Sequence, residues 1–184
     1  CDWSSDVCSS DLDAVIPYAQ QYDIKMAIHP DDPPWPLYGL PKVITNAEHI
    51  RHFLSLNSSP YHGITFCTGS LGSSMENDLP SMAAEFASQG RIHFAHLRNV
   101  KHLSKQDFDE CAHLSGCGDL DMYAIVEALS DNGFDGYIRP DHGRMIWGEQ
   151  ARPGYGLYDR ALGATYLAGL WEAAKKTQVT RTGI

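Results

Sequence analysis

The feature that most constrains the fold is a regular alternation of short apolar runs with amphipathic, helix-like segments. Four runs have the length and apolar content of buried strands: 25–30, 63–67, 91–100 and 136–143. Strands that alternate with helices pair in parallel, because each helix forms a right-handed crossover to the next strand of the sheet. The sequence therefore predicts an α/β fold built on a parallel sheet.

The segments between these runs carry the signals of helix ends. Asn46 and Asp78 stand where N-caps are expected, and Gly90 and Gly133 stand where helices end. We expect helices over 14–23, 47–57, 79–89, 120–133 and 157–176. Segments rich in Gly, Pro or polar residues are expected to be irregular, namely 31–41, 68–74, 101–119 and 144–156.

A potential metal ligand stands at the end of every predicted strand: His29, Cys67, His96 and Asp141. An open doubly wound sheet and a TIM barrel share the strand–helix alternation, but in a barrel the carboxyl ends of all strands meet at one mouth. Four donor groups at four strand ends therefore favour a TIM (β/α) barrel with one shared site. A whole barrel has eight such units and about 250 residues, so we expect a C-terminal half-barrel whose first half lies upstream.

Two imidazoles, a thiolate and a carboxylate form a mixed donor set. Each residue alone has another explanation: a strand-end His is more often hydrogen-bonded, Cys67 fits a small buried hydrophobe, and Asp141 fits a turn. Their coincidence at four strand ends favours a metal. Imidazole and thiolate suit Fe²⁺, Zn²⁺ or Co²⁺, and the carboxylate also tolerates Mn²⁺. Ligands on separate strands, without a C-x-x-C pair, are typical of a catalytic site.

The two ends of the chain are expected to lie outside the folded domain. Residues 1–12 read CDWSSDVCSSDL, which repeats S-S-D and resembles a translated sequencing adapter. We expect this segment to be non-native, or alternatively a disordered tail. Residues 13–176 form the C-terminal part of a single barrel domain, and 177–184 are expected to fray.

Composition restricts the partners and the compartment. The formal net charge is −9, with 14 Lys and Arg against 23 Asp and Glu, which gives no footprint for nucleic acid or anionic lipid. We find neither an apolar run of about 20 residues nor a signal peptide, so no membrane partner and a cytoplasmic location are expected. The five cysteines have no disulfide spacing and are expected to be reduced thiols.

Longer strings of the sequence resemble a known family. The strings AIHPDDPPWPLYGLP, FCTGSLGSSMENDLP, RIHFAHLRNVK and GYIRPDHGRMIWGEQARPGYGLYDRALGATYL are similar to those of the mannonate dehydratases, from about Asp13 to Lys176. The resemblance implies a xylose-isomerase-like TIM barrel that binds Mn²⁺ or Fe²⁺ at the four strand-end residues. It also implies a hydro-lyase that converts D-mannonate to 2-dehydro-3-deoxy-D-gluconate and water in hexuronate (glucuronate) catabolism.

Dehydration of a sugar acid needs a base for the C2 proton and an acid for the departing C3 hydroxyl. His142, directly after Asp141, is one candidate for these roles, because imidazole titrates near neutral pH. Tyr155, in the Gly-flanked loop RPGYG, is the other. The alternatives are that His142 only orients a ligand and that Tyr155 only packs over the mouth. Residue types do not decide which of the two is the acid.

Three further residues are expected to bind the substrate. Arg98 and Arg144 follow metal-bearing strands and suit a carboxylate or hydroxyls, although salt bridges inside the barrel are an equal alternative. Asp31 suits a sugar hydroxyl, or else orders the Pro-rich turn. Two other functions stay open at this point: a metal-dependent sugar isomerase or epimerase, and an inactive truncated fragment. The expected partner is a small sugar acid. Whether the protein forms a homo-oligomer is not decided by the sequence.

Overall fold

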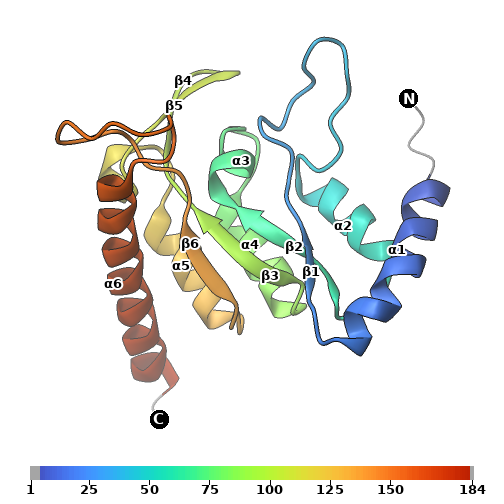
Figure 1. Cartoon of the computed structure of the whole chain (residues 1–184). Helices are drawn as coiled ribbons and strands as arrows, with labels where there is room; N and C mark the ends of the chain where they lie inside the picture. The colour runs from blue at the N-terminus through green and yellow to red at the C-terminus, as the bar shows by residue number, and fades with distance from the viewer. Residues whose placement is uncertain (1–4, 183–184) are drawn as a thin grey trace.

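The computed structural model describes residues 5–182 and is built on a four-stranded parallel sheet (Figure 1). The strands are β1 (Met26–Ile28), β2 (His62–Cys67), β3 (Ile92–Leu97) and β6 (Tyr137–Pro140). Their spatial order, β1-β2-β3-β6, follows their order along the chain. This is the arrangement of successive units of a (β/α) barrel rather than of a doubly wound sheet, whose strand order reverses. The four predicted strands and their parallel pairing are confirmed.

Five long helices follow the predicted alternation: α1 (Ser5–Gln21), α2 (Ala47–Ser55), α4 (Leu79–Ser88), α5 (Met122–Asp131) and α6 (Leu157–Thr182). Figure 1 shows α4 and α5 behind the sheet. The predicted caps are confirmed: the Asn46 side chain accepts a hydrogen bond from the amide of His49 at 2.9 Å, and Asp78 accepts one from the amide of Ser81 at 3.3 Å. No helix within residues 5–182 combines the length and apolarity that a bilayer crossing requires.

The core lies between the sheet and these helices. From the strands it takes the side chains that point outward at every second position, among them Phe66 on β2 and Leu97 on β3, both fully buried. From the helices it takes Phe86 and Leu129, also fully buried. The side chains at the remaining positions of these strands point to the inner face of the sheet, and they include those at the strand ends.

Two segments predicted to be irregular contain regular structure. The stretch 101–119 contains most of an antiparallel hairpin, formed by β4 (Val100–Ser104) and β5 (Asp107–Glu110), and a 3₁₀ turn, η1 (Ser115–Cys117). The hairpin strands are polar and short, so they lack the apolar alternation that identifies a half-buried strand. The predicted turn 68–74 contains a single helical stretch of five residues, α3 (Thr68–Gly72).

Both ends of the described chain are more regular than expected. Helix α1 already begins at Ser5, while residues 1–4 lie outside the described part; whether 1–12 are native stays a prediction. Helix α6 runs to Thr182, past the predicted end of the folded domain at 176, while the fraying of 177–184 stays a prediction. Near this end, Arg181 forms ion pairs with Glu127 at 3.1 Å and Asp131 at 3.4 Å on α5.

Candidate metal centre

The four predicted ligands converge at the carboxyl ends of the parallel strands. One donor atom each of His29, Cys67 and His96 lies within 4.8 Å of the other two. The Asp141 carboxylate joins them, with Oδ2 at 3.7 Å from Cys67 Sγ and Oδ1 at 3.6 Å from His96 Nδ1. Three of the predicted ligands therefore form a group compact enough for one ion, and Asp141 borders this group through Cys67 and His96.

Sheet register sets the two central donors side by side. Cys67 on β2 pairs with His96 on β3 only because the register slips between Ile64↔Ile92 and Thr65↔Phe94. Uninterrupted pairing from Ile64↔Ile92 would place Cys67 opposite Ala95, whose side chain belongs to the outer core. The extra residue, His93, is thus a β-bulge that turns His96 toward the centre.

Burial determines the protonation of both central donors. Burial, and then the charge of Asp141, raise the pKa of the Cys67 thiol to about 11. The amide and hydroxyl of Ser70, at 3.5 and 3.1 Å from the sulfur, act in the opposite direction. Burial lowers the pKa of His96 to about 4, although the Asp141 charge opposes the shift. Without a cation, these donors are a neutral thiol and a neutral imidazole at pH 7.

The donor set fits a divalent metal. Both ring nitrogens of His96 are buried and find no hydrogen-bond partner among residues 5–182. Buried polar atoms normally have partners, and a neutral imidazole without one offers a lone pair to a cation. Two imidazoles, a sulfur and a carboxylate form a set that borderline divalent ions accept.

His142 and Tyr155 lie together beside this centre. Their ring centroids are 6.1 Å apart. Backbone hydrogen bonds of 2.9 Å, from the Gly143 amide to the Gly154 carbonyl and from the Gly156 amide to the Gly143 carbonyl, fasten the Tyr155 loop to the His142 segment. His142 adopts a left-handed conformation, with φ at 54°. Burial, and then the positive charge of Arg98, lower the pKa of His142, which keeps the ring neutral at pH 7.

Arg98 is a buried hub of ion pairs, with only 3% of its side chain exposed. Its NH2 group lies 2.5 Å from Asp32 Oδ2, its NH1 group contacts Glu110 Oε1, and its Nε lies 3.5 Å from Asp141 Oδ2. A side chain at Gly69 would overlap the arginine, so glycine is needed there. These contacts favour the salt-bridge alternative for Arg98, and its predicted substrate role stays a prediction.

The other two predicted substrate residues are also engaged internally. Arg144 Nε and NH2 donate to the Asp159 carboxylate at 2.9 and 3.1 Å. Asp31 Oδ2 accepts from the backbone amides of Val43 at 2.7 Å and Ile44 at 2.9 Å, which orders the Pro-rich loop. The contacts again favour the structural alternatives, and direct contact with substrate stays untested.

Two residues near the metal centre were not predicted from the sequence. Arg139 pairs with His96 across the sheet and places NH2 3.6 Å from Asp141 Oδ1. Its position two residues before Asp141 is a signal that strand alternation offers. Glu110 contacts both Arg98 and His142. No local pattern identifies it, because it belongs to the hairpin that was predicted to be irregular.

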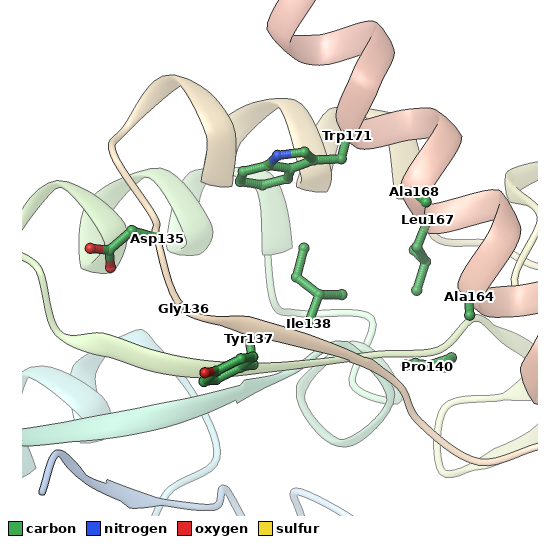
Figure 2. A pocket seen from close by; sticks show the side chains of 9 residues that line it. All are labelled: Asp135, Gly136, Tyr137, Ile138, Pro140, Ala164, Leu167, Ala168 and Trp171. Atoms are coloured by element: carbon green, nitrogen blue, oxygen red, sulfur yellow. The ribbon is translucent and has the colours of Figure 1, made fainter.

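An apolar cavity of about 470 Å³ lies on the other side of β6, away from these donors. Figure 2 shows Leu167 and Trp171 reaching from α6 toward Ile138. Ile138 and Arg139 are neighbours on one strand and therefore face opposite sides of the sheet. The cavity lacks the polar groups that converge at the metal centre, and we assign no chemistry to it.

Comparison with known proteins decides the family. The family model described as D-mannonate dehydratase matches residues 6–181. The chain belongs to this family. A mannonate dehydratase of Thermotoga petrophila is 59% identical over 165 residues, which are 90% of this chain and 46% of that protein. Mannonate dehydratase 2 of Halalkalibacterium halodurans is 59% identical over 162 residues, 88% of this chain and 47% of the relative.

Solved structures agree with the family and the fold. The crystal structure of mannonate dehydratase from Streptococcus suis serotype 2 superposes with a TM-score of 0.88 at 48% identity, over 92% of this chain and 49% of that one. A D-tagatose 3-epimerase-like protein superposes with a TM-score of 0.59 at 19% identity, which shows the fold alone. The predicted xylose-isomerase-like barrel is confirmed, and the chain spans about half the length of the mannonate dehydratases that it matches.

Proposed function

We propose that this chain carries the metal-binding part of a D-mannonate dehydratase, a hydro-lyase that forms 2-dehydro-3-deoxy-D-gluconate in hexuronate breakdown. The observation that carries the proposal is the close grouping of His29, Cys67 and His96 at the carboxyl ends of the parallel strands, with the Asp141 carboxylate beside Cys67 and His96. Membership of the family supplies the reaction and the substrate class.

The same four residues are proposed to hold Mn²⁺ or Fe²⁺. A divalent cation at this place would act as a Lewis acid that lowers the energy of negative charge developing next to the substrate carboxylate. The neutral state of His96 leaves its ring available for coordination, and the Ser70 donors partly offset the effect of burial on the Cys67 thiol. The family resemblance, rather than the donor set, favours these two ions over Zn²⁺.

His142 and Tyr155 are proposed to move the protons. The lowered pKa of His142 leaves a ring nitrogen free to accept the C2 proton at neutral pH. A phenol has a reference pKa of about 10 and is protonated at pH 7, so Tyr155 can donate to the leaving hydroxyl. The 6.1 Å between their rings suits two groups that act on adjacent carbons of one substrate.

Product analysis tests the proposal on the family-length protein, by which we mean a polypeptide that continues this chain to the length of its relatives. Purified protein loaded with Mn²⁺ or Fe²⁺ is incubated with D-mannonate, and the product is measured by a thiobarbiturate assay for 2-keto-3-deoxy acids and by mass spectrometry. We expect a product that has lost one water. A product of unchanged mass would instead indicate an isomerase or epimerase, and no product with either ion would reject the proposed substrate.

A further inference from the structure

The structure connects the β4–β5 hairpin to His142 through one carboxylate. Glu110 is the last residue of β5, and its Oε1 contacts both His142 Nδ1 and Arg98 NH1. Arg98 NH1 lies 3.0 Å from the same ring nitrogen. Two nitrogen groups therefore gather around one carboxylate oxygen, although the three residues involved come from three separate segments of the chain.

Glu110 and Arg98 make opposite demands on His142 Nδ1, because a carboxylate oxygen needs a proton there and an arginine N–H would need a lone pair. Arg98 NH1 already donates to Glu110 Oε1, so the contact with Glu110 is the one that selects the neutral tautomer. A carboxylate oxygen accepts hydrogen bonds and cannot donate, so close approach of Glu110 Oε1 requires a proton on Nδ1. An unprotonated Nδ1 would place its lone pair against a lone pair of the Glu110 oxygen, which is repulsive. With the proton on Nδ1, both Arg98 and His142 donate to Glu110, and the other ring nitrogen, Nε2, carries the free lone pair.

We propose that Glu110 is a positioning residue for His142, which fixes the ring orientation and holds the Nδ1–H tautomer so that Nε2 is the atom that takes a proton. The proposal rests on the proposed function for its consequence in catalysis, but the tautomer itself does not depend on that function. The left-handed backbone of His142 agrees with it, because such a conformation persists only where surrounding contacts hold it.

Glu110 is itself held in place from two sides. Arg98 neutralises its charge and is anchored in turn to Asp32 at 2.5 Å. Phe108, two residues earlier on the same face of β5, packs edge-on against Trp35 of the Pro-rich loop, with 6.0 Å between ring centroids. The hairpin and the Pro-rich loop are thus connected through Arg98, which pairs with both Glu110 and Asp32, and by an aromatic contact.

The first test reads the tautomer directly. The family-length protein is labelled with ¹⁵N-histidine and loaded with diamagnetic Zn²⁺, and the ring nitrogens are observed by long-range ¹H–¹⁵N NMR. A His142→Gln variant assigns the signal. We expect a protonated Nδ1 on His142, and its loss or exchange between tautomers in Glu110→Ala. The matched control is Asp109→Ala, which removes an exposed carboxylate from the other face of β5. An unchanged tautomer in Glu110→Ala would overturn the proposal.

The second test separates positioning from general damage. For dehydration of D-mannonate, we expect Glu110→Ala to lower kcat by roughly 10- to 100-fold while KM stays within about 2-fold. Glu110→Gln keeps an acceptor oxygen and is expected to recover part of kcat, whereas Asp109→Ala stays at the wild-type value. Equal kcat in Glu110→Ala and wild type would refute the positioning role.

The two tests fail in different ways. If the wild-type protein forms no dehydration product, the proposed function is wrong, while the NMR result still decides whether Glu110 holds the tautomer. If Glu110→Ala does not fold, Glu110→Leu replaces it in both tests, because leucine also removes the acceptor but keeps most of the side-chain volume. A His142 tautomer and a kcat equal to those of Asp109→Leu would then overturn the proposal.

Discussion

Adjacent residues on the same strands belong to two different environments. On the outer face, Phe66 and Ala95 are fully buried in an apolar core that strands and helices share. One position further along, Cys67 and His96 are almost as well buried but polar, and both His96 ring nitrogens lack a hydrogen-bond partner in the described part of the chain. The side chains of the two regions are similarly buried, but the His96 ring nitrogens lack the hydrogen-bond partners that buried polar atoms normally have.

The difference separates stability from chemistry. Burying an apolar side chain stabilises the fold by about 1.5–3 kcal/mol, whereas burying a polar group without a partner costs roughly 1–3 kcal/mol in proteins. His96 carries such unpartnered nitrogens at the end of β3, and the fold is weakened there unless a ligand compensates. The other three strand-end residues have polar contacts within the protein. We therefore expect substitutions on the outer face to change folding and substitutions at the strand ends to change metal content and turnover.

The strand ends should show the largest effect. In the family-length protein, Cys67→Ser and His96→Ala are each expected to abolish divalent-metal content and dehydration together, because each removes one of four donors. Elemental analysis and the keto-acid assay measure the two quantities. His52→Ala, on the exposed side of α2, is the matched control and should change neither. Bound metal and near-normal turnover in either ligand variant would contradict the assignment.

The next prediction concerns the 184-residue chain by itself. The outer strands β1 and β6 each have one strand neighbour, and Tyr137 on β6 is 83% exposed. Unpaired edges and exposed apolar side chains favour self-association and a loosely held mouth. We expect this chain alone to bind metal more weakly and to turn over D-mannonate at least about 100-fold more slowly than the family-length protein. Equal activity of the two would show that the strand ends are preorganised without the rest of a barrel.

The outer face gives a smaller effect of a different kind. Phe86 on α4 is fully buried in the core, so Phe86→Ala should lower the free energy of unfolding by about 3–5 kcal/mol. Urea unfolding measures this loss. Metal stoichiometry and kcat per folded molecule should stay unchanged, and a loss of metal from the folded fraction would break the separation between the two regions.

A local cap gives the smallest effect. Asn46→Ala removes the side-chain acceptor for the His49 amide at the start of α2, and about 1 kcal/mol of unfolding free energy should be lost. Asn46→Ser keeps an acceptor and is the control that should restore most of it. Thermal unfolding followed by circular dichroism can detect a loss of this size. Equal stability of Asn46→Ala and wild type would show that the cap does not stabilise the fold.

The sequence alone predicted the four parallel strands, the five long helices and the four candidate donors, but not the hairpin or the short helix α3. Apolar runs, N-cap residues and helix-ending glycines are local patterns, and local patterns identified the four strands and the caps at Asn46 and Asp78. His29, Cys67, His96 and Asp141 could be named because each one follows an apolar strand, and parallel strands bring their carboxyl ends together.

Only the tertiary structure decided how these parts meet. The β-bulge at His93 sets Cys67 opposite His96, and the hairpin brings Glu110 to His142. Ion pairs connect the end of α6 to α5. Each of these features depends on contacts between residues that are far apart along the chain. A local pattern carries no information about such contacts, because their free energy arises only when the distant partners are already in place.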